Sequence, residues 1–130
     1  MTNYPKIISA VKKAGIKRLQ IVGGAGSLLL PDGKRVMDGN LPEEIRGGVE
    51  SLAEIFYRYL QPEKELDWVF FSPAGSFTPG PRTGEYRLGT DHLIVGKDGK
   101  SGISVKDYAK AMVDEAENPQ RHRERFTIGY

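Results

Sequence analysis

Two turns of similar composition are the part of this sequence best suited to chemistry. Each follows an apolar run: the first turn is Gly23-Gly24-Ala25-Gly26-Ser27 and the second is Ser72-Pro73-Ala74-Gly75-Ser76. In an open α/β sheet, ligands bind in the crevice beyond the carboxyl ends of the strands. Small residues at two strand ends therefore predict a binding site to which the backbone contributes directly.

Neither this first turn nor a later glycine pair matches a phosphate-binding loop. A dinucleotide fingerprint needs a helix N-terminus directly after its glycines, and the residues after Ser27, Leu28-Leu-Leu-Pro-Asp-Gly33, do not begin one. Gly99-Lys100-Ser101 follows part of the phosphate-loop pattern, but Ile94 stands where the first glycine belongs. We expect a surface turn there.

Other polar residues have simpler explanations than catalysis. His92 and His122 lie far apart with no ligand-like spacing, and the chain has no cysteine, so no metal site is predicted. Glu43 and Glu44 suit the positive end of a helix. The segment Arg121-His-Arg-Glu-Arg125 could hold a phosphate, but a solvated connection between a helix and a strand is the favoured interpretation.

Composition limits the class of protein. The chain has 130 residues, which suits one domain spanning 1–130, and its 19 Lys plus Arg against 17 Asp plus Glu leave a formal charge of +2. With charges of both signs dispersed, no nucleic-acid partner is implied. No run approaches the ~20 apolar residues of a membrane span, and no signal peptide is recognised. These features, with the absence of cysteine, predict a cytoplasmic protein.

Hydrophobic periodicity predicts the first elements. Apolar residues at helical spacing indicate a helix over residues 3–14, and residues 17–24 are typical of a strand. Turn pairs over residues 27–40 indicate an excursion above the sheet. Residues 41–60 form the strongest predicted helix. The pair Gly47-Gly48 inside it indicates either a close backbone approach to a neighbour or ligand, or a locally weak helix.

The second half continues the alternation of strands and helices. Residues 68–71 are apolar enough for a strand covered on both faces. Short extended pieces are expected over 85–88 and 93–95, the latter closed by a hairpin-type turn at 97–100. Ser104 and Asp107 match a capping box that opens a helix ending near 118–119, and a strand over 125–130 follows.

This order predicts an α/β fold, a partial doubly wound (Rossmann-like) and mainly parallel sheet with flanking helices. Residues 18–23 and 68–71 are expected as strands of one sheet, both too apolar to face water. The flanking helices are expected over 42–60 and 105–117.

Four segments resemble the C-terminal half of the atypical short-chain dehydrogenase/reductases, near the NADH-flavin reductase-like and NmrA-like groups. They are Val22-Gly-Gly-Ala-Gly-Ser-Leu28, Ser72-Pro-Ala-Gly75, Gly102-Ile-Ser-Val-Lys-Asp-Tyr-Ala109 and Phe126-Thr-Ile-Gly129. The resemblance covers nearly all of the chain from Ile8 onward. An N-terminal Gly-rich βαβ unit, which holds the cofactor pyrophosphate in such proteins, has no counterpart, so the chain is expected to be a truncated form.

The resemblance implies a site in which Ser27 is the candidate catalytic residue. The turn before Ser27 would face the nicotinamide, and the backbone of residues 73–77 would donate amide hydrogen bonds to the carboxamide. The cofactor would be NAD or NADP, bound weakly or not at all by this chain alone, with a flavin as a further substrate. The implied cofactor-binding residues are Gly23, Gly24, Ala25, Gly26, Pro73, Ala74, Gly75, Ser76 and Phe77.

One departure from the family limits the reaction. No tyrosine in the chain has a lysine four residues later, so the Tyr-x-x-x-Lys pair that moves a proton in alcohol oxidation is absent. Hydride transfer to a flavin or a small quinone-type electron acceptor needs only alignment and exclusion of water. The expected function is thus an NAD(P)H-dependent reductase.

Two alternatives to an active reductase stay open. One is a catalytically silent, NAD(P)-responsive regulator of the NmrA-like kind, and the other is a truncated product that acts through protein contacts. In any of these cases a homodimer is expected, because the strand at 17–24 would lack a neighbour on one side.

Overall fold

The sheet is built around its most apolar strand, β2 (Asp67–Ser72), in a computed structural model that describes residues 4–130. β2 pairs in parallel with β1 (Arg18–Val22) on one side and with β6 (Glu124–Gly129) on the other. The short β4 (Arg87–Gly89) adds an antiparallel edge beside β6, which gives the order β1-β2-β6-β4. The predicted mainly parallel sheet is confirmed.

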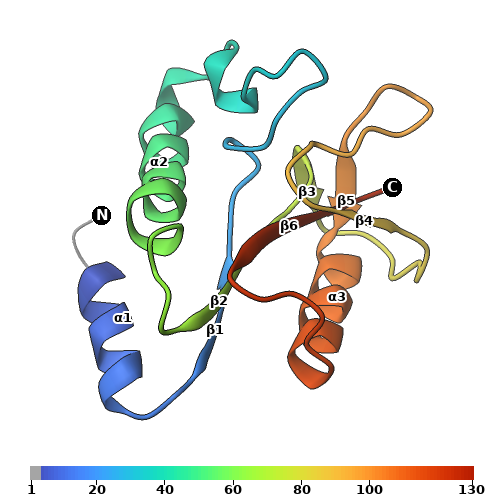
Figure 1. The fold of residues 1–130 in the computed structure, drawn as a ribbon. Coiled ribbons are helices and arrows are strands. Elements are labelled where there is room, and N and C mark those ends of the chain that lie inside the picture. The colour runs from blue at the N-terminus through green and yellow to red at the C-terminus, as the bar shows by residue number, and fades with distance from the viewer. Residues whose placement is uncertain (1–3) are drawn as a thin grey trace.

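Helices cover both faces of this sheet. α1 (Tyr4–Lys13) and α2 (Glu43–Glu54) lie on one side, and α3 (Val105–Glu117) lies on the other (Figure 1). The three predicted helices and the doubly wound arrangement are therefore confirmed, with α3 at its predicted bounds. Within residues 4–130, no helix is long and apolar enough to cross a membrane.

Alternation along β2 divides the interior into two cores. Trp68 and Phe70 point toward α1 and α2, whereas Val69 and Phe71 point toward α3. Each fully buried side chain of this size contributes about 1.5–3 kcal/mol of hydrophobic stabilisation. On the α3 face the ring of Phe71 stacks between those of Tyr108 and Phe126, with centroids 4.3 and 4.0 Å away.

The helix predicted over 41–60 is not regular throughout. After Glu54 it widens into a π-helical segment, η2 (Ile55–Leu60), in which the Gln61 amide donates to the Phe56 carbonyl at 3.0 Å. The wider turn brings Ile55, Phe56 and Leu60 into the core together, all of them nearly fully buried.

The excursions contain short elements that periodicity could not show. Residues 27–40 include the 3-10 helix η1 (Val36–Asp38), and β3 (Ser76–Thr78) pairs in parallel with β5 (Gly102–Ser104) in a separate two-stranded sheet. The extended piece predicted over 85–88 overlaps β4, whereas no strand forms over 93–95, where the Leu93 amide donates to the Leu29 carbonyl at 2.9 Å. The turn at 97–100 is present, with Gly99 at φ +80°.

Asp107 ties the start of α3 to two distant segments. The predicted cap is confirmed, since the Ser104 hydroxyl oxygen accepts from the Asp107 amide at 3.1 Å. The buried Asp107 carboxylate in turn accepts hydrogen bonds from the amides of Thr83 and Gly84, from the Thr83 hydroxyl and from the Tyr130 hydroxyl. Burial alone raises the pKa of this carboxyl, but these hydrogen bonds outweigh it and lower the pKa to about 2.

We expect Asp107 to make the fold sensitive to acid. The pKa of Asp107 is about 2 in the folded chain and near its ordinary value of 3.8 in the unfolded chain. Its contribution to the free energy of unfolding is therefore complete above about pH 4 and is lost as the pH falls toward 2. Asp107→Ala should lower the free energy of unfolding at pH 7 by about 2 kcal/mol. Urea unfolding at pH 7, 4 and 2.5 measures both effects. Asp114→Asn, which neutralises an exposed carboxylate of the same helix, is the control and should leave the loss of stability between pH 4 and 2.5 unchanged.

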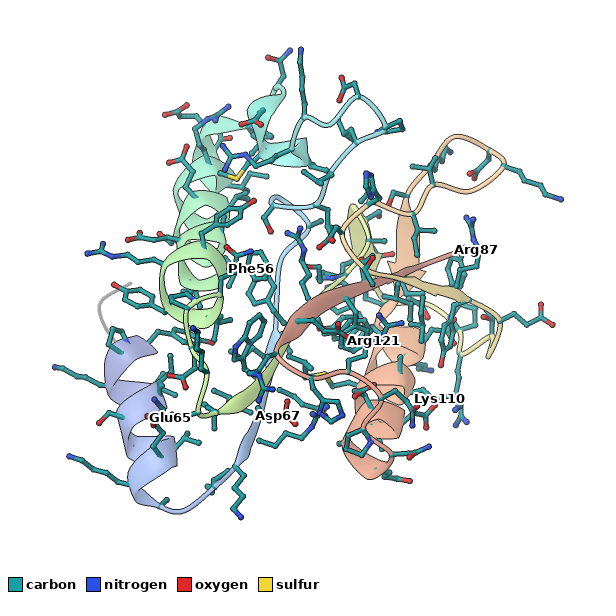
Figure 2. All side chains as sticks on the ribbon, viewed as in Figure 1. Phe56, Glu65, Asp67, Arg87, Lys110 and Arg121 are labelled. Carbon is teal, nitrogen blue, oxygen red and sulfur yellow. The ribbon has the colours of Figure 1, made fainter. Side chains whose placement is uncertain are left out.

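A charged cluster joins the elements at the opposite, amino end of the sheet. The Arg18 guanidinium donates to Asp67 at 2.9 Å, to Glu115 at 2.7 Å and to the Arg121 carbonyl at 3.0 Å. Asp67 also bonds to the His122 ring at 2.8 Å. In Figure 2, Asp67 and Arg121 lie at this end, far from the turns that follow β1 and β2. The cluster links β1, β2, α3 and the connection to β6.

β1 forms an edge of the four-stranded sheet, as the missing neighbour on one side predicted, but the exposure of this strand corrects another expectation. Residues 18–23 were predicted to be shielded from water, but β1 pairs only with β2 among the described residues, and Val22 is 54% exposed. An apolar strand edge with no bulge or proline is a template for pairing with another chain.

We expect the chain to form a two-fold dimer through the β1 edge. Light scattering coupled to size exclusion should give twice the chain mass of 14.4 kDa at micromolar concentration. Val22→Lys should weaken the dimer about tenfold or more, since a charge would be buried at the contact. Val113→Lys is the matched control, because Val113 is 52% exposed but lies on α3. A monodisperse wild-type monomer would contradict the expectation.

Candidate functional site

The two small-residue turns begin side by side at the carboxyl edge of the sheet. Val22 is in register with Phe71, and the Gly23 amide donates to the Phe71 carbonyl at 2.8 Å. The turns that follow these positions therefore start from adjacent strands. Their arrangement at one edge, which the resemblance implied, is present in the structure.

Close packing against the α2 side explains the glycines of the first turn. A β-carbon on Gly23 would lie 2.6 Å from the Phe70 ring, and one on Gly24 would lie 2.7 Å from Leu52. One on Gly26 would overlap the side chain of Val49. The approach of the turn to Phe70 and Val49 thus favours glycine at Gly23 and Gly26 whether or not a ligand binds, whereas the contact at Gly24 is with the end of the flexible Leu52 side chain.

A cavity of about 340 Å³ opens between this turn and α2. Its volume lies at the lower end of the range for small-molecule sites. Gly48 lies in its wall, and a β-carbon on Gly47 or Gly48 would meet nothing within 4 Å, so no described residue approaches this glycine pair closely. The lining residues are Gly24, Ala25, Gly26, Ser27, Glu44, Ile45, Gly48, Val49, Leu52, Ala53 and Phe70.

Ser27 lies at the end of the turn and is held by a buried arginine. Nη1 of Arg125 donates to the Ser27 hydroxyl oxygen and to the Ser27 carbonyl, both at 2.9 Å. Nε and Nη2 of Arg125 donate to Oδ1 of Asp91 at 3.3 and 3.1 Å. The guanidinium also lies 4.5 Å from the ring centroid of Phe56, which points from η2 toward the sheet in Figure 2.

The structure corrects the interpretation of Arg125 as part of a solvated connection. Arg125 is 6% exposed and belongs to β6. A buried cation is costly unless it is paired and fully hydrogen-bonded, and Ser27 with Asp91 supplies those partners. The neighbouring Arg123 remains exposed, in keeping with the original interpretation.

The second turn does not line the cavity. Pro73 and Ala74 are buried, and the chain then turns toward α3, where the Phe77 ring lies 4.8 Å from that of Tyr108. The amides of Gly75 and Ser76 donate to the Ser101 hydroxyl and carbonyl at 3.0 and 2.8 Å. Two of the amides proposed for a carboxamide are therefore already engaged within the chain.

Sequence reasoning missed a polar group beside Ser27 on the same face of the sheet. Arg125 is in register with Phe70, and Thr127 with Ser72, so all four side chains point to the α2 side. Thr127 donates to the Ser72 carbonyl at 2.7 Å, while the buried Ser72 hydroxyl has no partner among residues 4–130. The sequence contained a signal for this group, because alternation along 125–130 places Arg125 and Thr127 on one face of the strand and the apolar Phe126 and Ile128 on the other.

The two histidines do not belong to the site. His92 is exposed in a loop, and His122 bonds to Asp67 at the far end of the sheet. Across the described part of the chain, no group of His, Asp and Glu side chains could hold a metal ion.

Comparison with known proteins places the chain among nucleotide-binding folds. No family model matches it. It is 43% identical over 126 residues to the uncharacterized protein YwnB of Bacillus subtilis, and covers 59% of that protein. A solved structure from Bacteroides thetaiotaomicron, described as a candidate epimerase, is 58% identical with a TM-score of 0.94 over 98% of this chain and 59% of its own.

A second solved structure links the fold to redox chemistry. A protein from Streptococcus pneumoniae described as a candidate NADH-flavin reductase is 34% identical, with a TM-score of 0.79 over 86% of this chain and 55% of its own. A short-chain dehydrogenase/reductase from Veillonella parvula, solved with NADP, is 22% identical with a TM-score of 0.66 and shows the fold alone; 95% of this chain and 55% of that chain are covered.

The match is to part of each relative. The chain spans 59% of the curated relative and 55–59% of the solved structures described. Its fold is that of the C-terminal half of a short-chain dehydrogenase/reductase-like, NAD(P)-binding protein, as the four motif segments implied.

We expect the glycines of the first turn and of α2 to respond in opposite ways to substitution. Gly26→Ala should lower the free energy of unfolding by about 1–3 kcal/mol, because the added carbon overlaps the stiff Val49 side chain. Gly47→Ala has open space and should raise it by about 0.5–1 kcal/mol through helix propensity. Urea unfolding measures both. Equal effects of the two substitutions would contradict the packing explanation.

Proposed function

We propose that this chain forms the substrate side of an NAD(P)H-dependent reductase that passes hydride to a flavin or a small quinone-type acceptor. The observation that carries the proposal is the cavity beside Ser27 at the carboxyl edge of the sheet. Open α/β proteins bind their ligands at this edge. The candidate NADH-flavin reductase of similar fold supports the choice of reaction.

The residues present fit a nicotinamide and its partner ring. Among residues 4–130 the buried Ser72 hydroxyl has no hydrogen-bond partner, which is unusual unless a ligand or water completes it. In the proposal, Gly23–Gly26 and Pro73–Phe77 hold the nicotinamide between them, which requires the Gly75 and Ser76 amides to exchange their bonds to Ser101, and the acceptor occupies the cavity. When bound, the nicotinamide supplies the hydride.

The chain's own groups would align and shield the reacting rings. The cavity walls at Ile45, Val49, Leu52 and Phe70 are apolar and would exclude water from the reacting rings once the cavity is occupied. Ser27 and Glu44 are the polar side chains of the cavity wall, and the Ser27 hydroxyl, at the end of the turn, would orient the acceptor. Since no Tyr-x-x-x-Lys pair exists, proton movement to or from an alcohol is not part of the proposed reaction.

A second candidate is a regulator that binds NAD(P) without turnover. The bonds of Gly75 and Ser76 to Ser101 favour it, because they leave fewer backbone donors to orient a carboxamide for transfer. Such a protein would share the fold and the cofactor site but not the reaction. A module that acts through protein contacts alone would bind neither ligand.

We expect the 130-residue chain to bind NADPH and NADH weakly, with a dissociation constant in the millimolar range or above, about −4 kcal/mol. Within this sequence no Gly-rich turn opens a helix to hold the pyrophosphate. Nicotinamide mononucleotide should therefore bind about as well as NADH. Titration calorimetry tests this, and a micromolar constant would place the cofactor at a different pocket.

Turnover separates the three functions. The absorbance of NADPH at saturating concentration is followed with a flavin or menadione as acceptor, and the Ser27→Ala variant is measured in parallel. Oxidation that slows in the variant supports the reductase. Binding without oxidation supports the regulator, and neither effect supports the interaction module.

A further inference from the structure

A second pocket lies on the face of the sheet opposite the cavity beside Ser27. It opens between β4, β6 and the last turn of α3, and its volume is also about 340 Å³. Figure 1 shows α2 and α3 on opposite sides of the sheet. The apolar wall of this α3 pocket is formed by Tyr86, Leu88, Ala111 and Phe126. The proposed reductase site uses none of these residues, so that function does not explain the pocket.

The charged part of the α3 pocket is acidic. Asp114, Glu115 and Glu117 come from the last turn of α3, which contains no basic residue. The carbonyl groups at the end of a helix carry partial negative charge, so carboxylates there are unfavourable for the helix. Within the described part of the chain, no Lys, Arg or His side chain lines the pocket. The stability of α3 therefore does not account for this concentration of negative charge.

The cations that pair with these carboxylates do not belong to the wall of the pocket. Nζ of Lys110 pairs with Asp114, and Nη2 of Arg18 pairs with Glu115, each at 2.7 Å, but neither cation lines the pocket. The exposed Glu117 forms no ion pair among residues 4–130. The pocket is thus lined by carboxylates, and a positively charged ligand would meet no repelling side chain in its wall.

Glu115 supplies an acceptor atom at a fixed position. Its side chain is 7% exposed, and Oε2 accepts from Arg18 and from the amides of Gln120 and Arg121 at 2.7, 2.9 and 3.1 Å. All of these bonds, which are those that Glu115 forms within residues 4–130, are to Oε2. Oε1 is not among the fully buried atoms of the described chain that lack a partner, so it keeps accessible surface. Since Glu115 lines the pocket, Oε1 is open to a donor there.

The aromatic part of the wall also suits a cation. The Phe126 ring already has the Arg121 guanidinium 5.0 Å from its centroid, and it stacks on Phe71 at 4.0 Å. Tyr86 is partly buried beside the same cluster, and Leu88 is 48% exposed. Aromatic rings attract cations, and the apolar surface beside them can cover the body of a ligand.

We propose that the α3 pocket binds a small, planar organic cation, an amidinium or a guanidinium, which donates to Oε1 of Glu115 beside Glu117 and packs its apolar part on Tyr86 and Leu88. The N–H groups of such cations form short, charge-assisted bonds to carboxylates, and their planar faces stack on aromatic rings. This site is additional to the proposed reductase function and does not rest on it.

Three compounds of one shape test the charge that the α3 pocket prefers. Benzamidine is a planar cation, benzamide is its neutral analogue and benzoate is its anionic analogue. Each is titrated into the ¹⁵N-labelled chain, and dissociation constants come from the amide shifts of residues 86–88 and 111–120. Benzamidine should bind with a constant in the millimolar range, about fivefold or more tightly than benzamide. Benzoate should not bind detectably. Raising NaCl from about 20 to about 500 mM should weaken benzamidine and leave benzamide unchanged.

Variants locate the contact. Glu117→Gln should weaken benzamidine about threefold without affecting benzamide. Glu115→Gln keeps an oxygen in place but removes its charge, and should weaken benzamidine about fivefold. Glu50→Gln, at an exposed and ion-paired carboxylate of α2, is the matched control and should change neither constant. Should Glu115→Gln fail to fold because Arg18 loses a partner, Glu117→Gln and the salt dependence decide.

A blocked peptide with one arginine, acetyl-Leu-Arg-Leu-amide, separates two sources of the cation. If the pocket takes an arginine side chain of a partner protein, the peptide should bind more tightly than benzamidine. If it takes a small molecule, benzamidine should bind more tightly, and either result supports the site.

The proposal is overturned if benzamide or benzoate binds as tightly as benzamidine, or if neither glutamate variant weakens benzamidine. It is also overturned if the shifts fall at residues 24–27 and 44–49, because benzamidine would then occupy the other cavity, beside Glu44. None of the test variants changes a residue of that cavity, so the reductase function is tested separately.

Discussion

A buried positive charge is the constraint on which the architecture of the site depends. The Arg125 guanidinium lies inside the sheet-helix interface, where an unpaired cation costs several kcal/mol. The guanidinium is therefore stable there only with hydrogen-bond acceptors and an aromatic ring around it. Ser27 comes from the turn after β1, Asp91 from the loop after β4, and Phe56 from η2. One side chain thus fixes three segments that are distant in sequence, and the position of the first turn follows from it.

A second constraint is steric. The first turn passes so close to the Phe70 ring and to Val49 of α2 that a β-carbon at Gly23 or Gly26 would overlap them. The same contact leaves a hollow above Ala53 and Phe70, where Gly48 supplies no side chain. The cavity thus lies between the glycine-rich first turn and the part of α2 that contains Gly48. At the other end of the sheet, the Arg18 cluster is densely bonded, which keeps the strand ends that carry the site on a rigid base.

Much of the fold could be predicted because its signals are local. The apolar run of β2, the cap at Ser104 and the periodicity of the helices each depend on neighbouring residues, and all three were confirmed. The errors lie where the outcome depends on distant contacts. Residues 93–95 have a strand pattern but form no strand, and the Leu93 amide donates to the distant Leu29 carbonyl. Arg125 was placed in solvent because its neighbours are charged, although Phe56, Ser27 and Asp91 enclose it. The role of Ser27 stays a prediction.

The π-helical turn at Ile55–Leu60 divides one long helix into two parts with different surroundings. The first part, α2, lines the cavity, whereas Phe56 and Leu60 lie in the core beside Trp68 and Phe70. Because Phe56 also lies against the Arg125 guanidinium, the helix that forms one wall of the cavity is anchored through its second part to the residue that holds Ser27. The two walls of the cavity are thus positioned by one buried side chain.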